Sequence, residues 1–139
     1  MRNQKMIAKT PKNLPAPEPN FLNAAFLLEV TREPIVFQRT YVDLTQSVTA
    51  ALLLSSLQQI DQDHSAYEDG WFHISSEECH ALTGLTRYEQ ESARKILKTC
   101  GFLEEKRKGM PAKLLQRINY QRLTSAIKRQ AEAMMAVGI

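Results

Sequence analysis

Cysteine, glycine and long apolar runs are all scarce in this sequence of 139 residues. Its two cysteines are not closely spaced, so we expect neither a disulfide framework nor a zinc motif, and we infer a reducing, cytoplasmic setting. No apolar run approaches the roughly 18 residues of a membrane-spanning helix, and none follows the basic N-terminus as it would in a secretory signal. The length fits one domain with a short extension at either end.

Motifs for catalysis and for metal or cofactor binding are also missing. The five glycines form no phosphate-binding loop, and no serine lies in a nucleophile elbow. His64, His73 and His80 lack the spacing of metal ligands, and the adjacent Cys79 and His80 would point apart on a helix. We therefore expect no enzyme activity, no metal and no cofactor.

Charge is distributed unevenly along the chain, although the net charge is only +3. Residues 41–86 contain no Lys or Arg and seven Asp or Glu, whereas residues 87–129 contain twelve Lys or Arg and four Asp or Glu. An acidic block beside a basic block indicates that the second half of the chain faces a polyanion. Two ordinary solvated surfaces are the alternative that charge alone leaves open.

Composition divides the chain into four segments. Residues 1–20, with four prolines within nine positions, read as a flexible, basic arm. Residues 21–40 form an apolar segment for packing or dimerisation, which begins with a short helix capped by Asn20. Residues 41–130 form the folded domain, and residues 131–139 are the end of a final helix or a tail.

A long helix is expected at the start of the domain. Asp43 or Thr45 caps it, and it reaches about Ile60. Because residues 50–54 are all apolar, more than one face of this helix must be covered. The cover comes from the rest of the domain, with residues 21–37 or a second copy of the chain supplying the remainder. A homodimer is therefore one prediction from this helix.

Two capping boxes, eleven residues apart, mark the starts of two further helices. Ser75 with Glu78 forms the first box, and Thr86 with Glu89 forms the second. Gly84 lies between them and suits a tight turn, because glycine tolerates a positive φ. Two capped helices with a glycine-containing turn are the sequence form of a helix-turn-helix.

A β-hairpin is predicted directly after the second of these helices, which ends at Gly101. Its strands are residues 102–108 and 112–118, and a short strand at 71–74 precedes the first capping box. Asn119 then caps the final helix. The fold class is therefore mainly α with a small β-hairpin wing, a winged helix-turn-helix.

The candidate site combines the outer face of the second capped helix with the tip of the hairpin. The buried stripe of this helix includes Ala93 and Leu97, and its opposite stripe is basic with Glu91 as the only acid. Such side chains reach base edges or phosphates in a major groove, while wing cations lie against phosphates or the minor groove. The predicted DNA-binding residues are Arg87, Gln90, Arg94, Lys95, Lys98, Lys106, Arg107, Lys108 and Lys113. A solvated helix face and lysines that discourage edge pairing are the alternative.

A series of short motifs runs through residues 34–123. They are Phe37-Gln38-Arg39, Leu44-Thr45, Ala50-Ala51-Leu52-Leu53-Leu54-Ser55, Gly70-Trp71-Phe72, Glu77-Glu78, Thr83-Gly84-Leu85-Thr86-Arg87, Glu89-Gln90-Glu91, Ala93-Arg94, Leu97, Gly101-Phe102-Leu103-Glu104-Glu105 and Gly109-Met110-Pro111-Ala112. Together they resemble a winged-helix family of phages, plasmids and integrated mobile elements, and are similar to the N-terminal modules of DnaD-type replication organisers. The sequence has Gln46 where the family pattern has a glycine.

The resemblance, with the basic helix and wing, predicts a protein of a mobile element that binds double-stranded DNA. We expect a transcriptional regulator or an origin-binding replication accessory factor, associated with the nucleoid, homodimeric, and in contact with a protein of a replication or regulatory complex. The alternative is a winged-helix adaptor for protein interactions in a larger nucleoprotein complex, since fold alone does not assign function. Its contact surface would be the acidic stretch 41–86 and the apolar residues 21–30.

Overall fold

The chain divides into two compact units, residues 1–34 and residues 35–139. The residues that the computed structural model describes are 23–31, 34–63 and 68–138. The second unit begins at Ile35, whereas the sequence placed the domain boundary at residue 41. The arm predicted at residues 1–20 lies outside the described residues.

Helix α1 (Ala24–Thr31) is the short helix expected in the apolar segment, and none of its residues is buried. Its first turn is capped by Asn23, because the backbone N–H of Phe26 donates to Asn23 Oδ1 at 2.9 Å. Asn20, the cap expected from the sequence, lies outside the described residues.

Two helices, α2 (Arg39–Thr45) and α3 (Val48–Asp63), replace the single long helix expected at this point. Gln46, between them, adopts the left-handed conformation with φ 59° and ends α2. Ser47 then caps α3, since its Oγ accepts a hydrogen bond from the N–H of Ala50 at 3.1 Å. The residue that stands where the resemblance expects glycine thus keeps the backbone conformation typical of glycine.

The predicted caps Asp43 and Thr45 are wrong, because both lie inside α2. The carboxylate of Asp43 accepts from Arg39 Nε at 3.3 Å, one turn earlier in the same helix. The hydroxyl of Thr45 donates to the carbonyl oxygen of Tyr41 at 2.6 Å. Both side chains are therefore used within the helix that precedes the cap.

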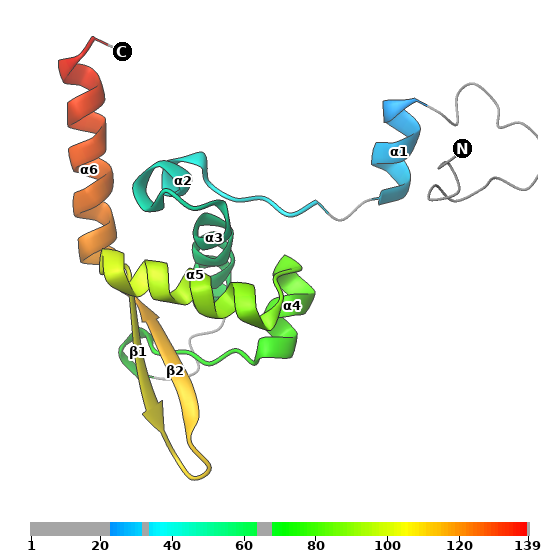
Figure 1. The fold of residues 1–139 in the computed structure, drawn as a ribbon, viewed down its shortest axis with the longest axis vertical. Helices are drawn as coiled ribbons and strands as arrows, with labels where there is room; N and C mark the ends of the chain where they lie inside the picture. The colour runs from blue at the N-terminus through cyan, green and yellow to red at the C-terminus, as the bar shows by residue number, and fades with distance from the viewer. Residues whose placement is uncertain (1–22, 32–33, 64–67, 139) are drawn as a thin grey trace, which may run out of the picture. The chain divides into compact units, whose positions relative to one another are not determined.

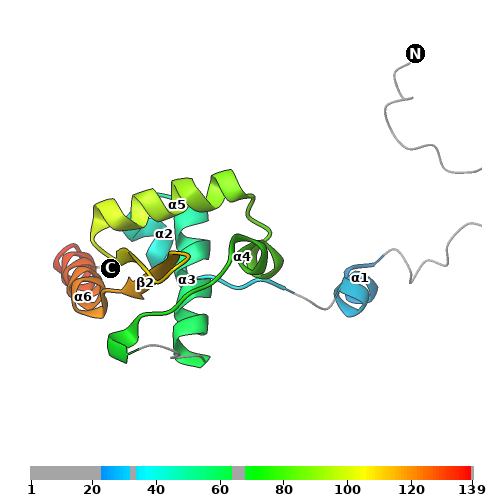
Figure 2. The ribbon, with the colours of Figure 1, turned by 90° about the horizontal axis from the view of Figure 1, so that it is seen from below.

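Helix α3 runs through the centre of the domain, with α2, α4 and α5 packed around it (Figures 1 and 2). Its residues Ala50, Ala51, Leu53, Leu54 and Leu57 are all buried. The apolar run at 50–54 is therefore covered within the domain, and this helix gives no reason to require a second copy of the chain.

The helix-turn-helix is confirmed as α4 (Ser76–Thr83) and α5 (Arg87–Cys100). Both predicted capping boxes are present, with Ser75 and Thr86 as the N-cap residues. Gly84 follows α4 in the left-handed conformation, with φ 78°, as the turn requires. The two helices meet across a short turn, so the side chains of one lie against the other.

The predicted hairpin is also present, as β1 (Leu103–Lys108) paired antiparallel with β2 (Lys113–Ile118). The strand expected at residues 71–74 is reduced to one bridge, in which Phe72 and Gln116 exchange two backbone hydrogen bonds of 2.8 Å. Helix-turn-helix and hairpin together make a winged helix, as predicted.

The final helix, α6 (Tyr120–Ala136), begins after the predicted cap Asn119 and leaves the base of the hairpin in the opposite direction (Figure 1). Leu123 is its buried residue, whereas Met134 and Met135 near its end are 47% and 75% exposed. None of the helices in the described part of the chain is long and apolar enough to span a membrane.

Leu97 of α5 is fully buried, and its truncation tests whether α5 is an integral part of the core. We expect Leu97→Ala to lower the free energy of unfolding by about 2–5 kcal/mol, because the lost side chain leaves a cavity. Leu82→Ala is the control, since Leu82 is 51% exposed and its loss should cost about 0.5 kcal/mol or less. Urea unfolding of both variants measures the difference, and equal losses would contradict this packing.

Candidate nucleic-acid interface

The predicted site residues of α5 differ in their exposure. Arg87 and Lys95 are exposed, as expected for residues that contact a partner. The side chains of Arg94 and Lys98 are 26% and 46% exposed, because both reach back to the wing. Gln90 is buried. The polar stripe therefore contains free cations, anchored cations and one internal residue.

Gln90 is a correction to the predicted DNA contacts. It is only 4% exposed, and its side-chain amide donates to the carbonyl oxygens of Ser76 at 3.1 Å and Leu85 at 3.0 Å. These two acceptors belong to the start of α4 and to the turn after it. The amide nitrogen therefore holds the helix-turn-helix together, and the little of this side chain that is exposed borders the cleft described below.

The cations of the wing lie on two faces of the hairpin, because successive side chains of a strand point to opposite sides. Arg107 faces the same side as the cleft described below. Lys106 faces the other side, where its Nζ lies 4.2 Å from the ring centre of Trp71. Lys108 and Lys113 are paired across the end of the hairpin and are exposed.

Two cations of the wing, Lys106 in the middle of β1 and Arg117 near the end of β2, lie over the ring of Trp71. Besides Lys106, the guanidinium of Arg117 lies 4.5 Å from the ring centre. Arg117 also makes an ion pair of 2.7 Å with Glu104. A cation over an indole ring is attracted by the negative face of the ring. This contact fixes the wing against the segment before α4.

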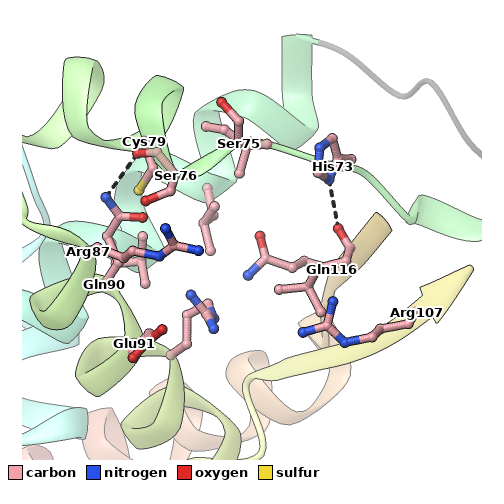
Figure 3. Close-up of a pocket in the computed structure, with 14 residues that line it drawn as sticks. His73, Ser75, Ser76, Cys79, Arg87, Gln90, Glu91, Arg107 and Gln116 are labelled. Atoms are coloured by element: carbon pink, nitrogen blue, oxygen red, sulfur yellow. Dashed lines mark hydrogen bonds between the residues drawn. The ribbon is translucent and has the colours of Figure 1, made fainter. Parts of the chain in front are cut away.

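A cleft of about 220 Å³ lies between the start of α4, the first half of α5 and the wing. Figure 3 shows Arg87 and Arg107 reaching toward it from opposite sides, with the amide of Gln116 pointing into it. The charged and polar residues of its lining are His73, Ser75, Ser76, Arg87, Gln90, Glu91, Arg94, Arg107 and Gln116. Two consecutive elements, α5 and β1, thus bring guanidinium groups to one cleft.

Glu105, on β1, is the partner that anchors α5 to the wing. Its carboxylate accepts from Arg94 Nε at 2.8 Å, from Lys98 Nζ at 2.8 Å and from Gln116 Nε2 at 3.4 Å. Burial alone would raise the pKa of Glu105, but the hydrogen bond from Lys98 and the charges of Arg94 and Lys98 outweigh it, so the pKa is lowered. The carboxylate is therefore ionised at neutral pH.

Sequence reasoning missed three residues of this region. Glu105 and Gln116 were not assigned roles, although strand alternation places Glu105 on the same face of β1 as Arg107. Tyr88, which follows Arg87 at the start of α5, is 77% exposed. Because Tyr88 lies beside the exposed Arg87, it is a further candidate for contact with a partner. In the sequence, only the capping box at Thr86 indicated that Tyr88 lies in the first turn of this helix.

The residues described by the structure hold no cluster of three or more His, Cys, Asp or Glu side chains that could bind a metal ion. Cys79 borders the cleft but is buried, and this burial raises the pKa of its thiol. Since the thiolate is the reactive form of cysteine, a raised pKa disfavours nucleophilic chemistry at this position. The cleft presents guanidinium and amide groups, which can bind anions, together with the carboxylate of Glu91.

The lowered pKa of Glu105 predicts a pH dependence of stability. Its ionised form stabilises the folded state above the pKa of the unfolded chain, and this contribution is lost as pH falls through the folded pKa. We expect Glu105→Gln to be less stable than the wild type by about 1–2 kcal/mol at pH 7, with the gap closing below about pH 4. Thermal and urea unfolding from pH 7 to pH 3 measures the gap, and a gap independent of pH would contradict the ionised anchor.

No protein family model matches the chain, and no curated protein matches its sequence. A solved structure described as the N-terminal domain of a DNA-binding protein is similar to it, with a TM-score of 0.46 and 14% sequence identity. The similarity covers 83% of this chain and 98% of that chain. At this level the likeness assigns neither a family nor an activity to the chain.

Proposed function

We propose that the chain binds double-stranded DNA through α5 and the wing. The observation that carries the proposal is the approach of Arg87 and Arg107 to one cleft from these two elements. Within the described residues neither guanidinium makes an ion pair, so both charges are available to an anion. A phosphate of the DNA backbone is an anion of suitable size, and arginine binds it with paired hydrogen bonds.

The exposed cations near this cleft extend the proposed interface. Lys108 and Lys113 at the wing tip and Lys95 on α5 are exposed and supply further positive charge. A helix and a hairpin that flank a duplex place such residues along the phosphate backbone, where they fix orientation without reading sequence. We propose binding alone for this surface, with no catalytic step.

Beyond DNA binding, we also propose a specific cellular role. The resemblance of residues 34–123 to winged helices of phages, plasmids and mobile elements supports a transcriptional regulator or an origin-binding replication accessory factor. Either role places the protein on the DNA of the nucleoid. The two roles differ in the site that is bound, a promoter or a replication origin, and selection of preferred sites from random DNA distinguishes them.

The test compares a doubly substituted interface with a matched surface control. We expect Arg87→Ala with Arg107→Ala to weaken binding to a random duplex and to make the log–log salt slope shallower by about 2, since each lost phosphate contact contributes about 0.9. Lys128→Ala with Arg129→Ala removes the same charge from exposed positions of α6 and should leave the slope unchanged. Fluorescence anisotropy between about 50 and 200 mM salt measures both.

Equal effects of the two double variants would contradict the assignment of the interface to the cleft. Absence of binding by folded wild-type protein at low salt would contradict DNA binding altogether. In that case the adaptor function would be favoured, and one observation supports it. A groove of about 860 Å³ runs between α2, the end of α5 and α6, lined by both apolar and polar residues that include Leu44, Phe102 and Gln130.

We also propose a homodimer, and the end of α6 is a contact that could form it. The last turn of this helix exposes Met134 and Met135, and its C-cap residue Val137 is also exposed, whereas the apolar run of α3 is already covered. Adjacent exposed apolar side chains of this kind mark association surfaces, and a two-fold protein suits a two-fold DNA site.

We expect Met134→Lys with Met135→Lys to shift the mass measured by light scattering from two chains to one, because each new charge would have to be desolvated in the contact. The domain itself should be unaffected, since both positions are exposed, and circular dichroism checks this. A wild-type protein that is monomeric at every workable concentration would contradict the dimer.

A further inference from the structure

The carboxylate of Glu105 has the cationic surroundings that a bound phosphate would have, because Arg94 and Lys98 both contact it. Both of its oxygens are used, one by Arg94 and the other by Lys98, each at 2.8 Å. Arg94 and Lys98 are four residues apart, so they lie one turn apart on the same face of α5. A carboxylate on the wing thus occupies the place where α5 presents two neighbouring positive charges.

The side chain of Glu105 is largely buried, whereas those of Arg94 and Lys98, which bind it, are more exposed. The side chain of Glu105 is 11% exposed, compared with 26% for Arg94 and 46% for Lys98. Arg94 also lines the cleft that Arg87 and Arg107 approach. Within the described residues Arg94 binds the carboxylate through Nε alone, so its two terminal nitrogens remain for a second acceptor.

A DNA phosphate offers the same chemistry as this carboxylate, namely oxygens that carry a single negative charge and accept hydrogen bonds from Arg and Lys. The two anions would therefore compete for the same donors. As long as the carboxylate holds Arg94 and Lys98, their attraction for other anions is reduced, because paired opposite charges largely cancel at a distance.

We propose that Glu105 is a specificity-determining residue, an internal competitor that withholds Arg94 and Lys98 from random DNA and releases them where a site offers better contacts. This inference rests on the proposed function. Arg87 and Arg107 then supply binding to any duplex, whereas Arg94 and Lys98 contribute where a phosphate or a base edge replaces the carboxylate. The carboxylate thus lowers binding to random sequence more than it lowers binding to a preferred site.

The experiment compares Glu105→Gln with Glu104→Gln on random duplex DNA. Glu104 is a matched control, because it is the adjacent acid of β1, lies on the opposite face of the strand and pairs with Arg117 and Asn119. Both variants remove one negative charge from the wing. We expect Glu105→Gln to bind more tightly than Glu104→Gln and to steepen the log–log salt slope by about 1–2, since one or two further cations contact phosphates.

A second comparison separates released cations from a merely displaced wing. Lys98→Ala is expected to weaken binding by about twofold or less in the wild type, where the ammonium is already occupied. In the Glu105→Gln background the same change should weaken binding by about threefold to tenfold. A thermal unfolding curve of each variant checks that the protein is folded at the assay temperature.

The outcomes distinguish the inference from the function on which it rests. Binding by the wild type, with equal slopes for Glu105→Gln and Glu104→Gln, would overturn the role of Glu105 and leave DNA binding in place. Weaker binding by Glu105→Gln with an unchanged slope would also overturn it, since Glu105 would then only position the wing. Absence of binding by the wild type and by both variants would overturn the proposed function and this inference together.

Discussion

The carboxylate of Glu105 joins two elements that only a short turn connects. Gly101 ends α5 with φ 85°, and the N–H of Phe102 donates to the carbonyl oxygen of Leu97, so β1 leaves the helix in a fixed direction. Farther along β1, Glu105 then accepts from Arg94 on the facing side of α5. The helix end and the ion pair together set the angle between α5 and the wing. The width of the cleft between these elements follows from that angle.

Much of the fold could be predicted because its signals are local. A capping box satisfies two backbone groups within four residues, so Ser75 and Thr86 mark helix starts whatever surrounds them. The break between α2 and α3 could not be predicted in this way. Gln46 adopts φ 59° although it is not glycine, and its residue type alone does not predict a positive φ. The strand predicted at residues 71–74 is shorter than expected, because only Phe72 pairs with the hairpin, through its bridge to Gln116.

The site could be predicted only as far as helical periodicity reaches. Periodicity identifies the face on which a residue lies, and it placed Arg87 and Lys95 correctly on the exposed side of α5. It does not identify neighbours from other elements. Gln90 meets two carbonyl oxygens of the helix-turn-helix, and Arg94 meets a carboxylate eleven residues later in the chain. Both contacts depend on how the elements pack, so they appear only in the folded structure.

Packing also changes how the charge of the basic segment should be interpreted. Residues 87–129 hold twelve basic and four acidic side chains, but several of these cations are already engaged. Arg94 and Lys98 bind Glu105, and Arg117 binds Glu104. Counterion release depends on the cations that actually meet phosphates, not on the total charge of a segment. If the proposed interface binds DNA, the salt dependence of binding should therefore follow the unpaired cations, whereas the paired ones hold the wing against α5.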